Sequence, residues 1–204
     1  SLFTGHITNT IIIYIFNMTP LHEVIINKKT SSKPLWIMRQ AGRYLPEFRE
    51  IRKNNPNFIE LCLNDKLATE ITLQPIKRFD LDAAIIFSDI LMLPYGLKQK
   101  VEFKKSFGPI LGELSVSAMS KLDEIDFIEQ VYPVYKAIKS VSSEMYSKNK
   151  NTIGFVGAPW TLLVYMINQQ SPKKNVKKNF FEDEYLINRV LLIIEKFLKI
   201  HIKN

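Results

Sequence analysis

Short apolar runs alternate along this chain with longer segments of helical periodicity. Residues 35–38 (LWIM) predict a short strand, whereas residues 83–87 (AAIIF) and 152–159 (TIGFVGAP) predict strands that are buried on both faces. The last of these runs ends in a Gly-Ala-Pro turn, and residues 101–110 predict a small hairpin or an ordered loop. Continuous apolar runs of this kind are typical of parallel sheets.

Helices are predicted in the segments between these strands. One helix opens at Pro46, where proline is suited to the first helical turn. A second helix begins at Asn64 or Asp65, either of which can cap it, and continues to Phe79 with a bend at Pro75.

The second half of the chain predicts three further helices. The first of them begins at Asp126, which has capping-box spacing to Glu129, and is kinked at Pro133. Its apolar residues recur in steps of three and four: Phe127, Val131, Val134, Ile138, Val141 and Met145. A short helix follows over residues 161–168. The final helix presents one face made of Ile187, Val190, Ile194, Phe197 and His201.

The order of these elements predicts a parallel β/α architecture. Two arrangements remain open, an open doubly wound sheet and a (β/α)8 barrel. A barrel typically needs about 250 residues. The chain has 204 residues and only three or four convincing strands, so a barrel would be incomplete.

Composition supports a globular protein with a substantial core, because 46% of the residues are hydrophobic and 24% are charged. The length suggests one or two domains. The net charge of +8 favours acidic partners, among which nucleic acid, a membrane surface and a polycarboxylate substrate all qualify. The single cysteine, Cys62, excludes a disulfide or a cysteine-based zinc cluster within these residues and is expected to be a small buried hydrophobe.

Two other segments predict less specific features. The apolar run at residues 11–16 is too short to span a bilayer and lacks the features of a secretory signal. It predicts a buried or edge strand, or the tail of a targeting leader. The basic run at residues 173–178 predicts a solvated loop, and the absence of interleaved aromatic residues argues against RNA stacking there.

Polar residues cluster directly after each predicted strand, where parallel β/α folds gather their chemistry. The clusters are Arg39, Gln40, Gly42 and Arg43 after the first strand, Ser88 and Asp89 after the second, and Trp160, Thr161 and Tyr165 after the third. Since the carboxyl ends of parallel strands meet at one edge, these clusters predict a single site.

Arginine dominates the first cluster and the helix that follows it, at Arg39, Arg43, Arg49 and Arg52. Guanidinium groups pair bidentately with carboxylate or phosphate, so these residues predict a pocket for several anions, with Gly42 allowing an unusual backbone turn. The alternative is a solvated basic helix face that pairs with Glu47 and Glu50. Arg49, which lies between both acids, fits this alternative best.

Asp89 is the candidate acid of the second cluster. A carboxylate after a buried strand suits a base, a metal ligand or a counter-ion for a cationic intermediate, and the alternative is a cap for the next segment. No second carboxylate or histidine lies nearby in the sequence, which disfavours a metal. Tyr165 is expected to donate a hydrogen bond into the same site or to lie in the core, and His201 is expected to be a core residue.

Taken together, these motifs resemble those of the uroporphyrinogen decarboxylase family. The first family signature is similar to PLWIMRQAGRYLPEFRE, and the second is similar to GFVGAPWTLLVYMI. Between them, in family order, lies ITLQPIKRFDLDAAIIFSDIL. The resemblance covers residues 34–169 and weakens after that.

The resemblance implies a (β/α)8 TIM barrel that is usually a homodimer and works in haem and porphyrin biosynthesis. It implies a lyase that removes the four acetate carboxylates of uroporphyrinogen, giving coproporphyrinogen, without any metal or organic cofactor and without a nucleic-acid or membrane partner. Because family members are longer, residues 18–204 are expected to be the N-terminal portion of one barrel domain. Residues 1–17 are expected to be a leader or an N-terminal extension, in a cytoplasmic or plastid protein.

The resemblance also assigns roles to individual residues. It implies that Arg39, Arg43 and Arg52 bind substrate carboxylates, that Ala41 lines the pocket with its backbone, that Asp89 contacts the pyrrole N–H groups and stabilises a pyrrole cation, and that Tyr165 is the active-site tyrosine.

Two rival functions stay open. A methyl-transfer protein of the same barrel superfamily needs zinc-ligating histidines and cysteines, which a single cysteine counts against. A non-catalytic tetrapyrrole or anion binder is favoured if the chain ends at Asn204.

Overall fold

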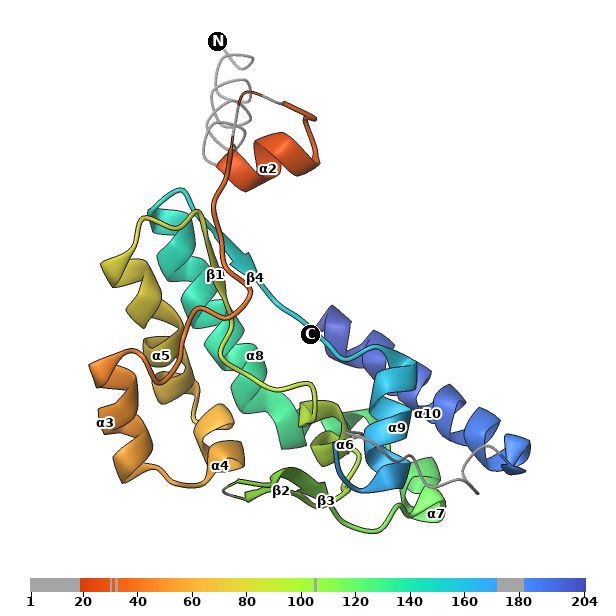
Figure 1. The fold of residues 1–204 in the computed structure, drawn as a ribbon. Helices are drawn as coiled ribbons and strands as arrows, with labels where there is room; N and C mark the ends of the chain where they lie inside the picture. The colour runs from red at the N-terminus through yellow and green to blue at the C-terminus, as the bar shows by residue number, and fades with distance from the viewer. Residues whose placement is uncertain (1–18, 30, 32, 105, 172–181) are drawn as a thin grey trace. The chain divides into compact units, whose positions relative to one another are not determined.

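The computed structural model describes residues 19–29, 31, 33–104, 106–171 and 182–204 (Figure 1). Its helices and its two small sheets make it an α/β protein. The chain divides into two compact units. The first contains the described residues of Ser1–Arg52, Lys66–Phe87 and Ala137–Gly154, and the second contains those of Lys53–Asp65, Ser88–Lys136 and Phe155–Asn204. Residues 1–17, with the apolar run at 11–16, and the basic run at 173–178 lie outside the described residues.

The core of the first unit forms around a parallel strand pair. Strand β1 (Ala83–Ile85) pairs with β4 (Asn151–Ile153), and Figure 1 shows helices α5 (Asp65–Arg78) and α8 (Glu124–Ser147) beside them. The parallel pairing confirms the predicted β/α pattern. The buried core cluster comprises Ala68, Leu73, Ile76, Leu81, Ala84, Ile86, Ala137, Val141 and Met145. Val141 and Met145 of α8 belong to the predicted apolar stripe.

Two further helices of the first unit begin with proline. Helix α2 (Pro20–Ile25) follows Thr19, whose side chain accepts a hydrogen bond from the backbone N–H of His22 at 3.2 Å. Helix α3 (Pro46–Asn54) opens at Pro46 as predicted and buries Phe48, whose ring lies 5.9 Å from that of Phe87. Helix α5 is also confirmed, and it ends one residue before the predicted limit.

The second unit contains the predicted hairpin and several short helices that the sequence pattern missed. Strands β2 (Val101–Lys104) and β3 (Gly108–Leu111) pair in antiparallel register, and Gly108 adopts a φ of 88°, in the left-handed region that favours glycine. Helix α4 (Phe58–Cys62) is capped by the Asn57 side chain, and its Phe58 ring lies 4.6 Å from that of Phe103. Cys62 is buried, as expected.

Helix α10 (Glu184–Lys203) packs on helices that include α6 (Met92–Gly96), α7 (Val116–Lys121) and α9 (Pro159–Asn168). Its predicted apolar face is confirmed, because Ile187, Val190, Ile194 and Phe197 are all buried. The ring of Phe197 lies 4.9 Å from that of Phe127 on α8. Helix α9 begins two residues earlier than predicted, since Pro159 occupies its first turn.

The predicted strand at residues 35–38 is wrong. These residues are irregular and exposed, with 58% of Leu35 and 68% of Met38 accessible to solvent. The free edge of β1, with which such a strand would pair, is occupied instead by the side chain of Gln40. Backbone pairing with this segment is limited to the N–H of Asp82, which donates to the carbonyl oxygen of Leu35 at 2.8 Å.

Two other predicted boundaries need correction. The strand predicted at residues 152–159 is limited to β4, which is only half-buried, and Phe155 and Val156 beyond it are exposed. The last backbone hydrogen bond between the two strands runs from the N–H of Ile86 to the carbonyl oxygen of Ile153, at 3.0 Å. Strand β1 is correspondingly shorter than predicted.

Helix α8 is capped three residues earlier than predicted. The carboxylate of Asp123 accepts a hydrogen bond from the N–H of Asp126 at 2.7 Å, so Asp126 lies inside the first turn. The predicted capping box of Asp126 and Glu129 is therefore wrong. The helix continues through Pro133, and its periodicity is unchanged by the earlier start.

Candidate active site

The first cluster forms a loop, residues 39–45, which we call the arginine loop. Gln40 attaches this loop to the sheet. Its side chain is 2% exposed; Nε2 donates to the carbonyl oxygen of Ala83 at 2.7 Å, and Oε1 accepts from the N–H of Ile85 at 3.1 Å. The backbone of the arginine loop is thereby fixed to the edge of β1.

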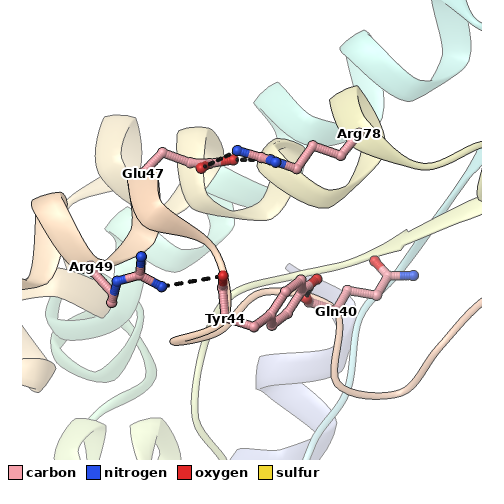
Figure 2. A network of polar contacts seen from close by, with 5 residues as sticks. All are labelled: Gln40, Tyr44, Glu47, Arg49 and Arg78. Carbon is pink, nitrogen blue, oxygen red and sulfur yellow. Dashed lines mark hydrogen bonds and ion pairs between the residues drawn. The ribbon is translucent and has the colours of Figure 1, made fainter.

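Arg49 and Tyr44 hold the other end of the arginine loop. Nη1 of Arg49 donates to the carbonyl oxygens of Arg43 at 2.8 Å and Tyr44 at 3.2 Å, and Figure 2 shows the guanidinium group directed at the second of these. The Tyr44 hydroxyl donates to the carbonyl oxygen of Gln40. Leu45 is buried, and its N–H donates to the carbonyl oxygen of Gly42 at 3.0 Å. The loop is therefore closed by its own hydrogen bonds.

Glu47 pairs with a residue that the sequence pattern did not single out. Its carboxylate accepts two hydrogen bonds from Arg78, from Nε at 2.7 Å and from a terminal nitrogen at 2.8 Å (Figure 2). This bidentate contact lowers the pKa of Glu47 and raises that of Arg78. Arg49 donates to backbone carbonyls, and its charge also lowers the pKa of Glu47, whose carboxylate joins α3 to the end of α5.

The predicted anion ligands of the arginine loop are presented to solvent. Arg39 and Arg43 are both exposed, and their guanidinium groups form no hydrogen bond or ion pair with any residue that the structure describes. Ala41 between them is partly buried, as is Arg52 on α3. The loop therefore combines a fixed backbone with two available guanidinium groups.

Gly42 does not make the unusual turn that the sequence predicts. Its φ lies outside the left-handed region, and a Cβ atom added there would meet only the Tyr44 ring, at 3.6 Å. That separation is an ordinary van der Waals contact. The shape of the loop therefore comes from the contacts of Gln40, Tyr44 and Arg49 and does not require glycine.

Asp89 lies in the second unit, shortly after β1. One carboxylate oxygen, Oδ1, accepts a hydrogen bond from the N–H of Leu91 at 2.8 Å and closes a local turn, whereas the cap position of α6, Leu91, has no side-chain cap bond. Oδ2 has no hydrogen-bond partner among the described residues. Burial raises the pKa of Asp89, and the Leu91 amide opposes this rise only in part. The structure thus shows a poorly solvated carboxylate with one oxygen available.

Tyr165 also lies in the second unit, on α9, and is partly buried. Its hydroxyl is 3.4 Å from Oγ of Ser171, a long hydrogen bond in which either atom can donate.

Of the predicted site residues, Arg39, Ala41 and Arg43 lie together on one loop, with Arg52 on the adjoining helix. Asp89 and Tyr165 belong to the other unit, and the convergence of the two groups remains a prediction.

His201 is a core residue, as expected. Its Nδ1 lies 2.8 Å from the hydroxyl oxygen of Tyr135, and its ring packs edge-on against Phe127. Burial lowers the pKa of His201 to about 4 and raises that of Tyr135.

Two features are absent from the described part of the chain. No group of three or more histidine, cysteine, aspartate or glutamate side chains there is arranged to hold a metal ion. None of the helices in the same residues has the length and apolar character needed to cross a membrane.

Comparison with known proteins gives a consistent result. The family model described as "Uroporphyrinogen decarboxylase (URO-D)" matches residues 17–204. A protein named uroporphyrinogen decarboxylase from Rickettsia felis is 42% identical over 185 residues, which cover 88% of this chain and 53% of the relative. Relatives of the same name come from Agrobacterium fabrum, 46% identical over 70% of this chain and 42% of the relative, and from Campylobacter jejuni, 39% identical over 89% and 54%.

The match extends beyond the signatures seen in the sequence. It includes α10, which follows the region where the resemblance weakens. The chain spans about half the length of the curated relatives it matches. The chain belongs to the uroporphyrinogen decarboxylase family.

Proposed function

We propose that this chain acts in the decarboxylation of uroporphyrinogen, in which the four acetate side chains lose carbon dioxide to give coproporphyrinogen. The observation that carries the proposal is the pair of exposed guanidinium groups on the arginine loop, in a chain of the uroporphyrinogen decarboxylase family. The substrate is a polycarboxylate, and the chain has a net charge of +8. This charge would attract the substrate before any specific contact forms.

Arg39, Arg43 and Arg52 are the proposed carboxylate ligands, and Ala41 lines the same pocket. A guanidinium group holds a carboxylate through two parallel hydrogen bonds. Each hydrogen bond to a charged group contributes about 1.5–3 kcal/mol. Several such contacts account for binding and orientation of the substrate.

Asp89 is the proposed stabiliser of the reacting ring. A proton adds to a pyrrole ring carbon, and the ring becomes a cation. The bond to the carboxylate then breaks, its electron pair neutralises the ring, and carbon dioxide leaves. The resulting methylene carbon takes up a proton and the ring carbon loses one, which completes a methyl group. A carboxylate near the pyrrole nitrogens stabilises the cation.

The expected size of this effect is large enough to matter. A pair of opposite charges about 4 Å apart interacts by about 4 kcal/mol at an effective dielectric constant near 20. That energy corresponds to roughly a thousandfold in rate. The raised pKa of Asp89 supports the role, because a carboxylate that water solvates poorly gains more from a cationic partner. Tyr165 is proposed as a hydrogen-bond donor to the same substrate.

The proposal extends to the architecture. The parallel β1–β4 pair, with Asp89 after β1, supports a (β/α)8 barrel of which residues 18–204 form the N-terminal portion. A homodimer, a cytoplasmic or plastid location and a leader at residues 1–17 are further parts of the same proposal. They rest on the family resemblance alone.

A second candidate is a tetrapyrrole or anion binder without catalytic activity. It is favoured by the fact that the contacts that shape the arginine loop lie within the first unit. Anion binding therefore requires no residue of the unit that contains Asp89 and Tyr165.

The test is to incubate the chain with uroporphyrinogen and follow the formation of coproporphyrinogen, beside a binding titration at several salt concentrations. Turnover supports decarboxylation, and salt-sensitive binding without turnover supports the binder. Salt-independent binding, or no binding, contradicts both. Arg189→Ala is a matched control, since Arg189 is an exposed arginine on α10, outside the candidate site.

A further inference from the structure

We infer that Gln40 and Arg49 are positioning residues, which hold the backbone of the arginine loop so that Arg39 and Arg43 present their guanidinium groups in a fixed arrangement. The inference rests on the proposed function of those two arginines as carboxylate ligands. It assigns a role to two residues that are not themselves ligands.

The side chain of Gln40 takes the place of a neighbouring strand. In a parallel sheet, one residue donates its N–H to a carbonyl on the next strand and accepts from an N–H two residues further along that strand. The Gln40 carboxamide makes this same pair of hydrogen bonds, to Ala83 and Ile85. Their backbone groups lie on the edge of β1 opposite β4, whereas the N–H of Ile86 bonds to β4.

The placement of Gln40 in the sequence couples this attachment to the anion ligands. Gln40 directly follows Arg39, and its backbone carbonyl accepts the hydrogen bond from the Tyr44 hydroxyl. A buried carboxamide, hydrogen-bonded through both its nitrogen and its oxygen, therefore anchors the peptide next to an exposed guanidinium group. Loss of this anchor would release the loop, and ordering it again on binding would weaken affinity.

Arg49 performs the complementary task at the other end of the loop. Its guanidinium group binds two successive carbonyl oxygens, of Arg43 and Tyr44. Both bonds come from Nη1, whose two N–H groups have directions fixed by the planar guanidinium group, whereas a lysine ammonium acts as a point charge on a flexible stem. The positive charge of Arg49 is therefore less important than its shape.

The first experiment measures the loop without substrate. In Gln40→Ala, amide hydrogen exchange at Ile85 is expected to accelerate at least about tenfold, because its N–H loses a partner, while exchange at Ile86 stays unchanged. Equal acceleration at both amides would indicate a general loss of structure. Unchanged exchange at Ile85 would overturn the inference.

The second experiment uses a conservative change that titrates. In Gln40→Glu, the ionised carboxylate still accepts from Ile85 but presents an oxygen to the Ala83 carbonyl, and protonation restores the missing donor. Binding of uroporphyrinogen is expected to weaken about tenfold near neutral pH and to recover, relative to the parent chain, as the pH is lowered to about 5. A ratio between variant and parent that does not change with pH contradicts the positioning role, even if Gln40→Ala fails to fold.

The third experiment separates shape from charge. Arg49→Lys and Arg49→Gln are both expected to weaken binding by roughly the same factor, between about three- and tenfold. Arg189→Lys is the control. Full binding by Arg49→Lys with weak binding by Arg49→Gln would show that only charge matters and would overturn the inference for Arg49.

These outcomes are distinguishable from failure of the proposed function. If Arg39→Ala and Arg43→Ala leave uroporphyrinogen binding unchanged, the proposed function is wrong, whatever the other variants do. If those two variants weaken binding but all Gln40 and Arg49 variants bind normally, the positioning inference is wrong and the proposed function stands.

Discussion

The arginine loop and the His201–Tyr135 pair use polar groups in opposite ways. In the second unit, the imidazole of His201 and the hydroxyl of Tyr135 satisfy each other at 2.8 Å and are enclosed by aromatic packing. In the arginine loop, hydrogen bonds hold the backbone, while the guanidinium groups of Arg39 and Arg43 remain exposed. Polar groups that stabilise a fold are paired inside it, whereas groups that bind a ligand are held on a fixed backbone with their charge available.

Asp89 combines features of both regions. Burial raises its pKa, as burial also shifts the pKa of His201, yet only one of its carboxylate oxygens is hydrogen-bonded to a described residue. A residue that is buried at a cost and incompletely paired is a candidate for function. Substitution of Asp89 tests whether it belongs with the proposed ligands Arg39 and Arg43 or with the structural pair.

The largest expected effect is on turnover. Asp89→Asn keeps an acceptor for the Leu91 amide but removes the charge, so kcat for uroporphyrinogen is expected to fall about a thousandfold with little change in substrate binding. The measurement is single-turnover decarboxylation beside a binding titration. Asp123→Asn, which removes a charge at the start of α8, is the control; equal losses in turnover and in binding by Asp89→Asn would contradict the stabiliser role.

The next effect is on the pH dependence of stability, through the His201–Tyr135 pair. The pKa of His201 is lowered to about 4 in the folded chain, below its ordinary value of 6.5, so the unfolded chain binds a proton more readily. The neutral histidine therefore contributes its full stabilisation above about pH 6.5, and about 3 kcal/mol is lost as the pH falls to about 4. Urea unfolding of the parent chain and of His201→Phe across this range measures it. An unchanged pH dependence in the variant would exclude His201 as the cause.

A smaller effect is expected at the arginine loop. Arg39→Ala and Arg43→Ala should each weaken uroporphyrinogen binding about ten- to a hundredfold, as expected for loss of a charge-assisted hydrogen bond. Added salt should weaken binding by the parent chain more than by either variant, since part of the attraction is already lost. The titrations include Arg189→Ala. If that control weakens binding as much as the loop variants, the contacts are not specific.

The smallest expected effect is on the free energy of unfolding, and it tests whether Asp89 is a structural residue. Its pKa in the folded chain is raised above the ordinary value of 3.8, so folding favours the protonated form, and the ionised form opposes folding at neutral pH. Asp89→Asn is therefore expected to increase the free energy of unfolding near neutral pH, and the gain should disappear below pH 3.8. Denaturant unfolding at both pH values measures the difference. Destabilisation at neutral pH would place Asp89 with the structural residues.

Local patterns predicted the longer helices well because their signals are local, whereas the short helices α2, α4, α6 and α7 were missed. The apolar face of α10 and the opening of α3 at Pro46 follow from spacing along one helix. The cap of α8 was misplaced only because Asp123 and Asp126 are both good capping residues three positions apart.

Contacts between distant segments were not predictable in this way. The strand expected at residues 35–38 is absent because a side chain, that of Gln40, binds the edge of β1 more than forty residues away, and no periodicity reports such a contact. The pairing of Glu47 with Arg78, 31 residues apart, is likewise a contact that no local pattern reports. For the candidate site, motifs pointed to Arg39 and Arg43 as the proposed ligands, but the contacts of Gln40 and Arg49 with the loop emerge only from the structure.

The most direct test of the account is an experimental structure of the chain with uroporphyrinogen bound. We expect substrate carboxylates within hydrogen-bonding distance of the guanidinium groups of Arg39 and Arg43, and the pyrrole N–H groups directed at the carboxylate of Asp89. A substrate bound to the arginine loop with its pyrrole rings directed away from Asp89, or bound elsewhere on the chain, would contradict it.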